Sequence, residues 1–198
     1  MFRELQNNKI GNLLIYLASN IKDLGITKSL KLLYLIDETS VREICTPVTW
    51  LEYKVWEMGP VAVDIYNEIQ HLENSILSTF VKIEKRQAFD YETTIIKPIK
   101  EFNDSEFNDY EIELFDRIIA KYAHLSAKSV IDILHQEGTL WHKNVMKNEL
   151  QFAFSVYNKR SNVVIELADL VSDNELKLTA YKSAVNALEF KTQLQNND

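Results

Sequence analysis

Apolar residues recur at three- and four-residue steps along most of the chain, which is the spacing of helices that bury one face. The first such stretch covers residues 5–21. The second begins near Thr27, a residue type that caps helices, and continues to about Arg42. The sequence therefore predicts a pair of helices at the start of the chain.

Three further helices are predicted in the middle of the chain. Pro60 suits the first turn of one of them, and Ser126 suits the cap of another, which ends near Gly138. Between them, the segment from Glu101 to Asp116 holds seven carboxylates and no base. Its apolar residues share one stripe, so it predicts an acidic amphipathic helix.

Extended structure is predicted at two places. Residues 47–50 combine Pro47 with β-branched and aromatic side chains, so we expect a short strand or an extended turn there. The apolar segments from Phe80 to Ile83 and from Thr93 to Ile96 are separated by a polar stretch. This pattern predicts a β-hairpin with a loose tip.

The chain becomes more polar after residue 150, and two further helices are predicted in that part. One would carry the residues from Val163 to Leu170, and the other would follow a cap near Ser172 or Asp173. The resulting fold class is mainly α. We expect a compact helical domain over residues 1–150 with a small β-hairpin or winged-helix-like element, and a helical C-terminal extension over 151–198 packed on or beside it.

Charge and cysteine content narrow the class of protein. The net charge is −7, and residues 101–198 carry 16 acids against 10 bases. Nucleic-acid binding depends on dense lysine and arginine, so DNA is not the expected partner. The single Cys45 excludes an intramolecular disulfide, and charges interrupt every apolar stretch. We therefore expect a cytoplasmic protein without a membrane span or secretory signal.

Candidate reactive groups are sparse. Among four histidines, only His135 lies at a helical spacing from a second ligand type, Asp132, and zinc requires more ligands than this pair. Nucleophile-elbow and phosphate-binding glycine motifs do not occur. The expectation is a protein that is not an enzyme and has no metal or cofactor. An unfamiliar active site anchored at Asp132 and His135 is the rival hypothesis.

Aromatic residues are concentrated between positions 34 and 66. Such rings either pack in a core or supply broad contact area at a protein interface. Both interpretations remain open for this group, which comprises Tyr34, Trp50, Tyr53, Trp56 and Tyr66.

Two blocks of residues are similar to those of one family. The first contains Lys31-Leu32-Leu33-Tyr34, Pro47, Trp56-Glu57-Met58-Gly59-Pro60-Val61 and Asp64-Ile65-Tyr66; the second runs from Leu125-Ser126-Ala127 through His135 to Trp141. Their order over residues 8–148 resembles the Panacea domain of the SocA-like antitoxins. Thr46 before Pro47 and Val55 before Trp56 depart from that pattern.

The resemblance implies a mostly helical domain with a small β element that binds and neutralises a cognate protein toxin, often in a phage-associated locus. It also implies an adaptor role, with a protease or chaperone as a further partner. An acidic face over 101–116 would speed encounter with a basic toxin. The candidate signature and partner-binding residues are Lys31, Tyr34, Trp50, Trp56, Gly59, Pro60, Tyr66, His135 and Trp141.

The alternative function is a DNA-binding transcriptional regulator of winged-helix type. Short helices precede the hairpin predicted at 80–96, and this hairpin could act as the wing. It carries Lys82, Lys85 and Arg86, whose charges would then lie near phosphates.

Overall fold

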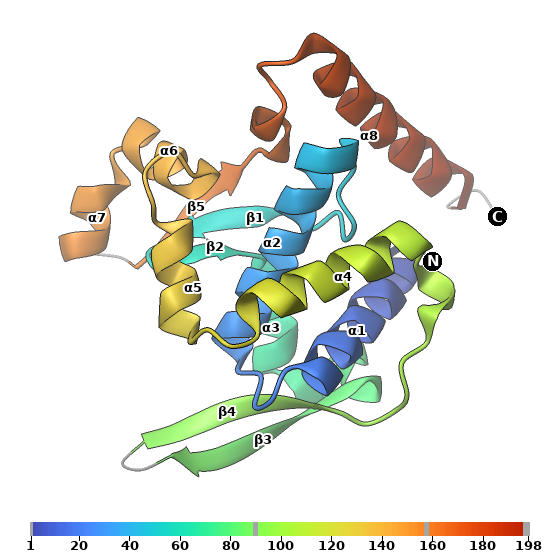
Figure 1. Cartoon of the computed structure of the whole chain (residues 1–198), viewed down its shortest axis with the longest axis vertical. Coiled ribbons are helices and arrows are strands. Elements are labelled where there is room, and N and C mark those ends of the chain that lie inside the picture. Colours follow the sequence, from blue (N-terminus) through green and yellow to red (C-terminus); the bar gives the residue numbers. More distant parts are fainter. Residues whose placement is uncertain (1, 89–90, 157–158, 196–198) are drawn as a thin grey trace.

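The computed structural model describes residues 2–88, 91–156 and 159–195 (Figure 1). Two long helices, α1 (Phe2–Asn20) and α2 (Ile26–Ile44), lie in its centre. Helix α2 contacts elements from all parts of the chain and buries residues along nearly its whole length. The mainly α fold class is confirmed.

Both ends of α2 differ from the sequence prediction. The helix begins at Ile26 and not at Thr27, because the extended backbone of Gly25 stands at the cap position and its carbonyl accepts from Ser29 N at 3.0 Å. It continues to Ile44 and ends at the buried Cys45, which adopts a left-handed conformation with φ 59°.

A small antiparallel sheet lies beside α2, with the strand order β2-β1-β5. Its strands are β1 (Tyr53–Trp56), β2 (Gly59–Val61) and β5 (Arg160–Ile165). Residues 47–50, predicted as a short strand or an extended turn, form no strand and bend at Val48 and Thr49. The helix start predicted at Pro60 is wrong. Pro60 belongs to an edge strand, where its missing N–H breaks no ladder bond, and helix α3 (Val63–Gln70) begins three residues later.

The helix predicted from Val163 to Leu170 is also wrong. Val163 and Val164 lie in β5, and a 3-10 turn, η4 (Leu167–Leu170), follows. Strand β5 pairs with β1 through Tyr53 opposite Ile165. The division of the chain at residue 150 stays a prediction, and this pairing places part of the C-terminal segment in the same sheet as β1.

The second sheet is the predicted hairpin, made of β3 (Val81–Ala88) and β4 (Tyr91–Pro98). It projects at the lower left of Figure 1. Ile96 N donates to the carbonyl of Leu24 at 2.8 Å, which ties β4 to the α1–α2 connection. The polar stretch from Glu84 to Glu92, predicted as a loose tip, belongs mostly to the two strands, whose pairing continues to Ala88 opposite Tyr91; residues 89–90 lie outside the described residues. Two 3-10 turns, η1 (Leu72–Asn74) and η2 (Ile76–Thr79), precede the hairpin.

The remaining helices cover the second half of the chain. The acidic helix α4 (Asp109–Tyr122) begins later than Glu101 because Asn108 and Glu111 form a capping box, and a 3-10 turn, η3 (Asp104–Glu106), precedes it. Ser126 caps α5 as predicted. The other helices are α5 (Ala127–Leu134), α6 (Leu140–Lys147), α7 (Leu150–Val156) and α8 (Glu175–Gln195). Within the described ranges, every helix is too short or too polar to span a bilayer.

Candidate functional site

The turn between β1 and β2 is held from below by Lys31 of α2. The Lys31 side chain is only 1% exposed, and its Nζ donates to the carbonyl oxygen of Pro60 at 2.7 Å. Gly59 has φ +96°, and a β carbon at this position would lie 3.3 Å from Lys31 Cε. The Gly-Pro pair therefore lets the strand pass directly over the lysine.

Burial changes the acid–base properties of Lys31. Loss of hydration lowers the pKa of its ammonium group from 10.5 to about 7. The group is thus close to half-protonated at neutral pH. A buried lysine of this kind is strongly influenced by any charge that approaches it.

His135 and Trp141 complete the floor of the turn. Their rings are stacked, with centroids 3.8 Å apart and planes inclined by 6°. Trp141 Nε1 donates to the carbonyl of Trp56 at 2.9 Å, which links α6 to β1. Burial and the nearby Lys31 charge lower the pKa of His135, so its imidazole is mainly neutral at pH 7.

Three side chains form the outer wall above this floor. The rings of Trp56 and Tyr66 meet edge to face at 5.1 Å. The Arg160 guanidinium lies 4.5 Å from the Trp56 centroid and 5.5 Å from that of Tyr66. Met58 projects beside them from the turn and is 52% exposed.

A hollow of about 300 Å³ lies between this wall and α2. We call it the hairpin groove. Its lining is mainly apolar, aromatic and basic, with one acid, and comprises Thr27, Leu30, Lys31, Trp56, Glu57, Met58, Val61, Tyr66, Lys159 and Arg160. Such a surface has the composition of a protein-contact site, in which aromatic rings, Met and Arg are enriched.

Asp37 organises the segment before β1. Its carboxylate is fully buried and accepts from the backbone N–H of Val48 and of Thr49, each at 2.8 Å. The hydroxyls of Thr49 and Tyr53 also donate to it, the latter at 2.8 Å. Burial raises the pKa of Asp37, while these hydrogen bonds act in the opposite direction. This clamp explains why residues 47–50 form a loop and not a strand.

The sequence candidates divide into two groups. Seven of them gather at the hairpin groove or directly beneath it: Lys31, Trp56, Gly59, Pro60, Tyr66, His135 and Trp141.

The other two candidates lie elsewhere. Tyr34 is 1% exposed and packs edge to face on Tyr53 at 5.2 Å, so it belongs to the core. Trp50 has φ 56° and lines a separate hollow with Gln6 of α1 and Leu188 of α8.

Sequence reasoning missed two residues of this region. Asp37 stands on the apolar stripe of α2, at helical spacing from Leu33 and Tyr34, and a carboxylate at such a position indicates a buried polar contact. Arg160 lies in the polar part of the chain after residue 150 and is not among the predicted site residues. No local pattern identifies it, because its aromatic partners lie about a hundred positions earlier, with Tyr66 at a separation of 94.

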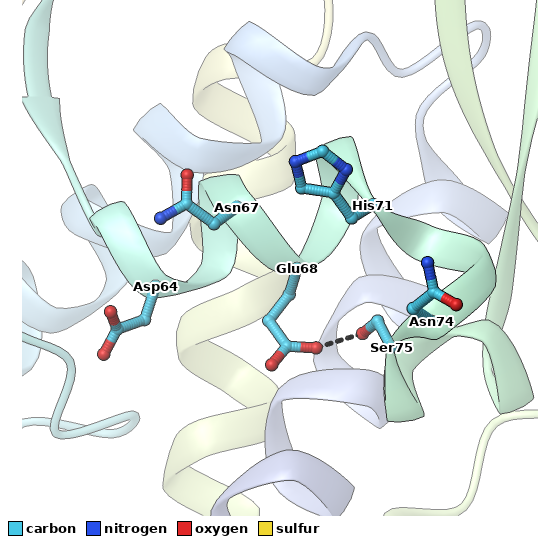
Figure 2. A pocket seen from close by; sticks show the side chains of 6 residues that line it. All are labelled: Asp64, Asn67, Glu68, His71, Asn74 and Ser75. Carbon is cyan, nitrogen blue, oxygen red and sulfur yellow. Dashed lines mark hydrogen bonds between the residues drawn. The ribbon is translucent and has the colours of Figure 1, made fainter.

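A second hollow, of about 280 Å³, is polar (Figure 2). It lies along α3, and Glu68 accepts a hydrogen bond from the Ser75 hydroxyl there. In Figure 2 the His71 imidazole points away from the Glu68 carboxylate, so the two groups are not arranged as an acid–base pair. Across the part of the chain that the structure describes, no three His, Cys, Asp or Glu side chains are grouped to hold a metal ion.

The other sequence hypotheses concern Asp132 and the hairpin bases. Asp132 is exposed, whereas the Nε2 atom of His135 is buried without a hydrogen-bond partner among the described residues. On the β3–β4 hairpin, Lys82 pairs with Glu84 at 2.8 Å and Arg86 pairs with Asp23. Lys82 and Arg86, both predicted to lie near phosphates, therefore already face carboxylates.

Comparison with known proteins identifies a family. The family model described as antitoxin SocA-like, Panacea domain, matches residues 30–142. This range contains all of the hairpin groove except Thr27, Lys159 and Arg160. No curated protein and no solved structure matches the chain.

Proposed function

The chain belongs to the SocA-like antitoxins with a Panacea domain, and from this premise we propose that it neutralises a cognate protein toxin by direct binding. Neutralisation by binding requires no bond-making group on the antitoxin. It requires a surface on which the favourable contacts with the toxin outweigh the costs of desolvation and of the entropy lost on association.

The observation that carries the proposal is the wall of the hairpin groove. Trp56 and Tyr66 present part of their rings to solvent, and Met58 is exposed at the tip of the turn. Arg160 lies over both rings and so joins a cation to the aromatic surface. A few residues carry most of the binding energy at protein interfaces, and Trp, Tyr and Arg are enriched among them.

Rigidity of this surface also supports the proposal. The Pro60 carbonyl is bonded to Lys31 and the Trp56 carbonyl to Trp141, so both strands of the turn are fixed from beneath. A surface that is ordered before binding loses less conformational entropy when the partner arrives.

The proposal includes the setting of the protein. We propose a cytoplasmic antitoxin that acts without a catalytic step and whose partner is encoded in a phage-associated locus. Delivery of the toxin to a protease stays a prediction from the family resemblance. It is tested by measuring the half-life of the toxin with and without the chain.

Growth rescue tests the proposed function. Each neighbouring reading frame is expressed alone and together with the chain, and binding is measured by co-purification of the full-length proteins. We expect one product that stops growth alone, is harmless together with the chain, and co-purifies with it. Rescue without association would contradict neutralisation by binding, and absence of rescue would contradict the antitoxin assignment.

A further inference from the structure

A larger hollow lies next to the hairpin groove, along the first turns of α2. This larger hollow has a volume of about 600 Å³ and reaches β4 and the α4–α5 connection. The two hollows share the lining residues Thr27, Leu30 and Tyr66, so they lie next to each other. We call the two together the extended groove.

The charge of the extended groove is opposite to that of the chain. Its described lining contains five bases and two acids, whereas the whole chain has a net charge of −7. The bases are Lys22, Lys28, Lys31, Lys159 and Arg160, and the acids are Asp23 and Glu57.

Both acids already face bases. Glu57 pairs with Lys159 at 3.2 Å. Asp23 pairs with Arg86 and lies 3.8 Å from Lys97 on the β3–β4 hairpin. Their negative charge is therefore largely balanced and does not offset the remaining lysines of the groove.

Two of those lysines donate to carbonyl groups. Lys28 Nζ donates to the carbonyls of Ala123 and Leu125, both at 2.7 Å, and Lys31 Nζ donates to that of Pro60. A carbonyl satisfies a hydrogen-bond donor but does not neutralise its charge. In their protonated form both amines therefore place positive charge at the groove, while burial lowers both pKa values and leaves Lys31 close to half-protonated at neutral pH.

Resting on the proposed function, we infer that the extended groove receives an acidic segment of the toxin in an extended conformation, with an apolar or aromatic side chain seated against Trp56 and Tyr66. Carboxylates of the segment would lie toward the lysines, and its apolar side chain would cover the rings and Met58. The carboxylates of such a segment complement the basic lining, and its apolar side chain complements the aromatic wall.

A protein segment fits these residues better than a nucleic acid does. Lys28 and Lys31 are 7% and 1% exposed, so neither can reach a phosphate on a duplex surface. Nucleic-acid affinity requires several exposed bases in direct contact with phosphates. Buried ammonium groups act instead on an anionic side chain that enters the groove.

Photocrosslinking in cells tests this inference with the full chain and the toxin found by growth rescue. The photoreactive residue p-benzoylphenylalanine replaces Met58 at the rim of the groove. The control replaces Leu176 of α8, which is 84% exposed. We expect position 58 to crosslink a toxin peptide rich in Asp and Glu, and position 176 to give no such product. A crosslinked peptide of net positive charge would overturn the inference.

Substitutions that place a carboxylate in the groove give an independent test. Arg160→Glu should weaken toxin binding at least tenfold, and Met58→Asp should weaken it as well. Lys147→Glu, which makes the same charge change at an exposed site on α6, should leave it within twofold. Circular dichroism checks that each variant is folded.

The outcomes separate the two proposals. If the wild-type chain rescues growth and Arg160→Glu and Met58→Asp rescue equally well, the groove assignment is wrong and the antitoxin function stands. If the wild-type chain rescues growth against no neighbouring product, both are wrong. Retardation of promoter DNA by the wild-type chain that Arg160→Glu removes would assign the groove to nucleic acid and would also overturn the inference.

Discussion

Gly59 crosses directly above the side chain of Lys31, so closely that a β carbon on the glycine would lie 3.3 Å from Cε and 3.4 Å from Nζ of the lysine. The same glycine has φ +96°, a conformation that other residues adopt only with strain. Two separate constraints, one conformational and one steric, therefore act at a single position of the turn.

Replacement of Gly59 by alanine should reveal both constraints. We expect Gly59→Ala to lower the free energy of unfolding by about 2–3 kcal/mol, through strain and through displacement of Lys31. Gly138→Ala is the matched control, because Gly138 has φ +87° and no atom lies within 4 Å of its virtual β carbon. The control should lose about 1 kcal/mol in urea unfolding. Equal losses would show that contact with Lys31 contributes nothing.

The buried Lys31 should make stability depend on pH. Its pKa is about 7 in the folded chain and 10.5 without burial, so between these values the unfolded chain binds more protons. Stability therefore rises with pH in this window, by about 2–3 kcal/mol between pH 7 and pH 9. Lys31→Met should flatten this rise, whereas Lys147→Met should keep it. Urea unfolding at several pH values measures the slopes, and an unchanged slope for Lys31→Met would contradict the assignment.

The four donors around Asp37 predict a graded response to substitution. Asp37→Ala leaves two buried N–H groups and the hydroxyls of Thr49 and Tyr53 without their acceptor, so we expect a loss on the order of 3–5 kcal/mol. Asp37→Asn keeps one acceptor oxygen and can donate to the hydroxyls, so the loss should be about 1–2 kcal/mol. Thermal and urea unfolding would distinguish the two, and similar losses would argue against the clamp.

Much of the fold follows from local pattern, because most of its elements are helices whose apolar stripes can be read along the sequence. Ser126 illustrates this, since it caps α5 where a capping residue was expected. The hairpin of β3 and β4 was also predictable, because its two strands are neighbours in the sequence. In both cases the information lies within a few residues of the element.

The elements that were misread depend on distant partners. Val163 and Val164 fit either a helical or an extended pattern, and they are extended because their segment pairs with β1. The Ser161 hydroxyl, for example, donates to the Val55 carbonyl across 106 positions. Pro60 pairs with Val55 only five positions away, and its distant partner is Lys31 of α2, whose Nζ donates to the Pro60 carbonyl across 29 positions. Local periodicity contains no information about either distant contact.

The candidate site was predictable through its family pattern more than through its chemistry. His135 and Trp141 were chosen as members of a block, and the structure shows why they occur together, since the two rings stack and Trp141 bonds the Trp56 carbonyl. Arg160 lies outside the matched range 30–142 and was not identified. Its role follows only from the pairing of β5 with β1.

Exposed acids near the start of α4 should affect how fast the toxin arrives and not how long it stays. Glu111 is bonded to Lys9 and Asp116 to the Tyr16 hydroxyl, both at 2.6 Å, so these two acids are engaged within the fold. Asp104, Asp109 and Glu113 are exposed. Exposed charges steer encounter, whereas buried contacts control dissociation.

Neutralising Asp104, Asp109 and Glu113 together, as Asn, Asn and Gln, should therefore slow association with the toxin about three- to tenfold at low salt and leave dissociation unchanged. The difference should vanish near 1 M salt, where the screening length is about 3 Å.

A matched control removes the same charge from three exposed acids of the C-terminal segment, Asp173, Glu175 and Glu189. Arg160→Glu should instead raise the dissociation rate, because we place Arg160 in the proposed contact with the toxin. Stopped-flow and surface-binding kinetics across a salt series measure both rates. If the control slows association as much as the α4 variant does, net charge and not the acidic face governs encounter; if salt has no effect, steering is absent.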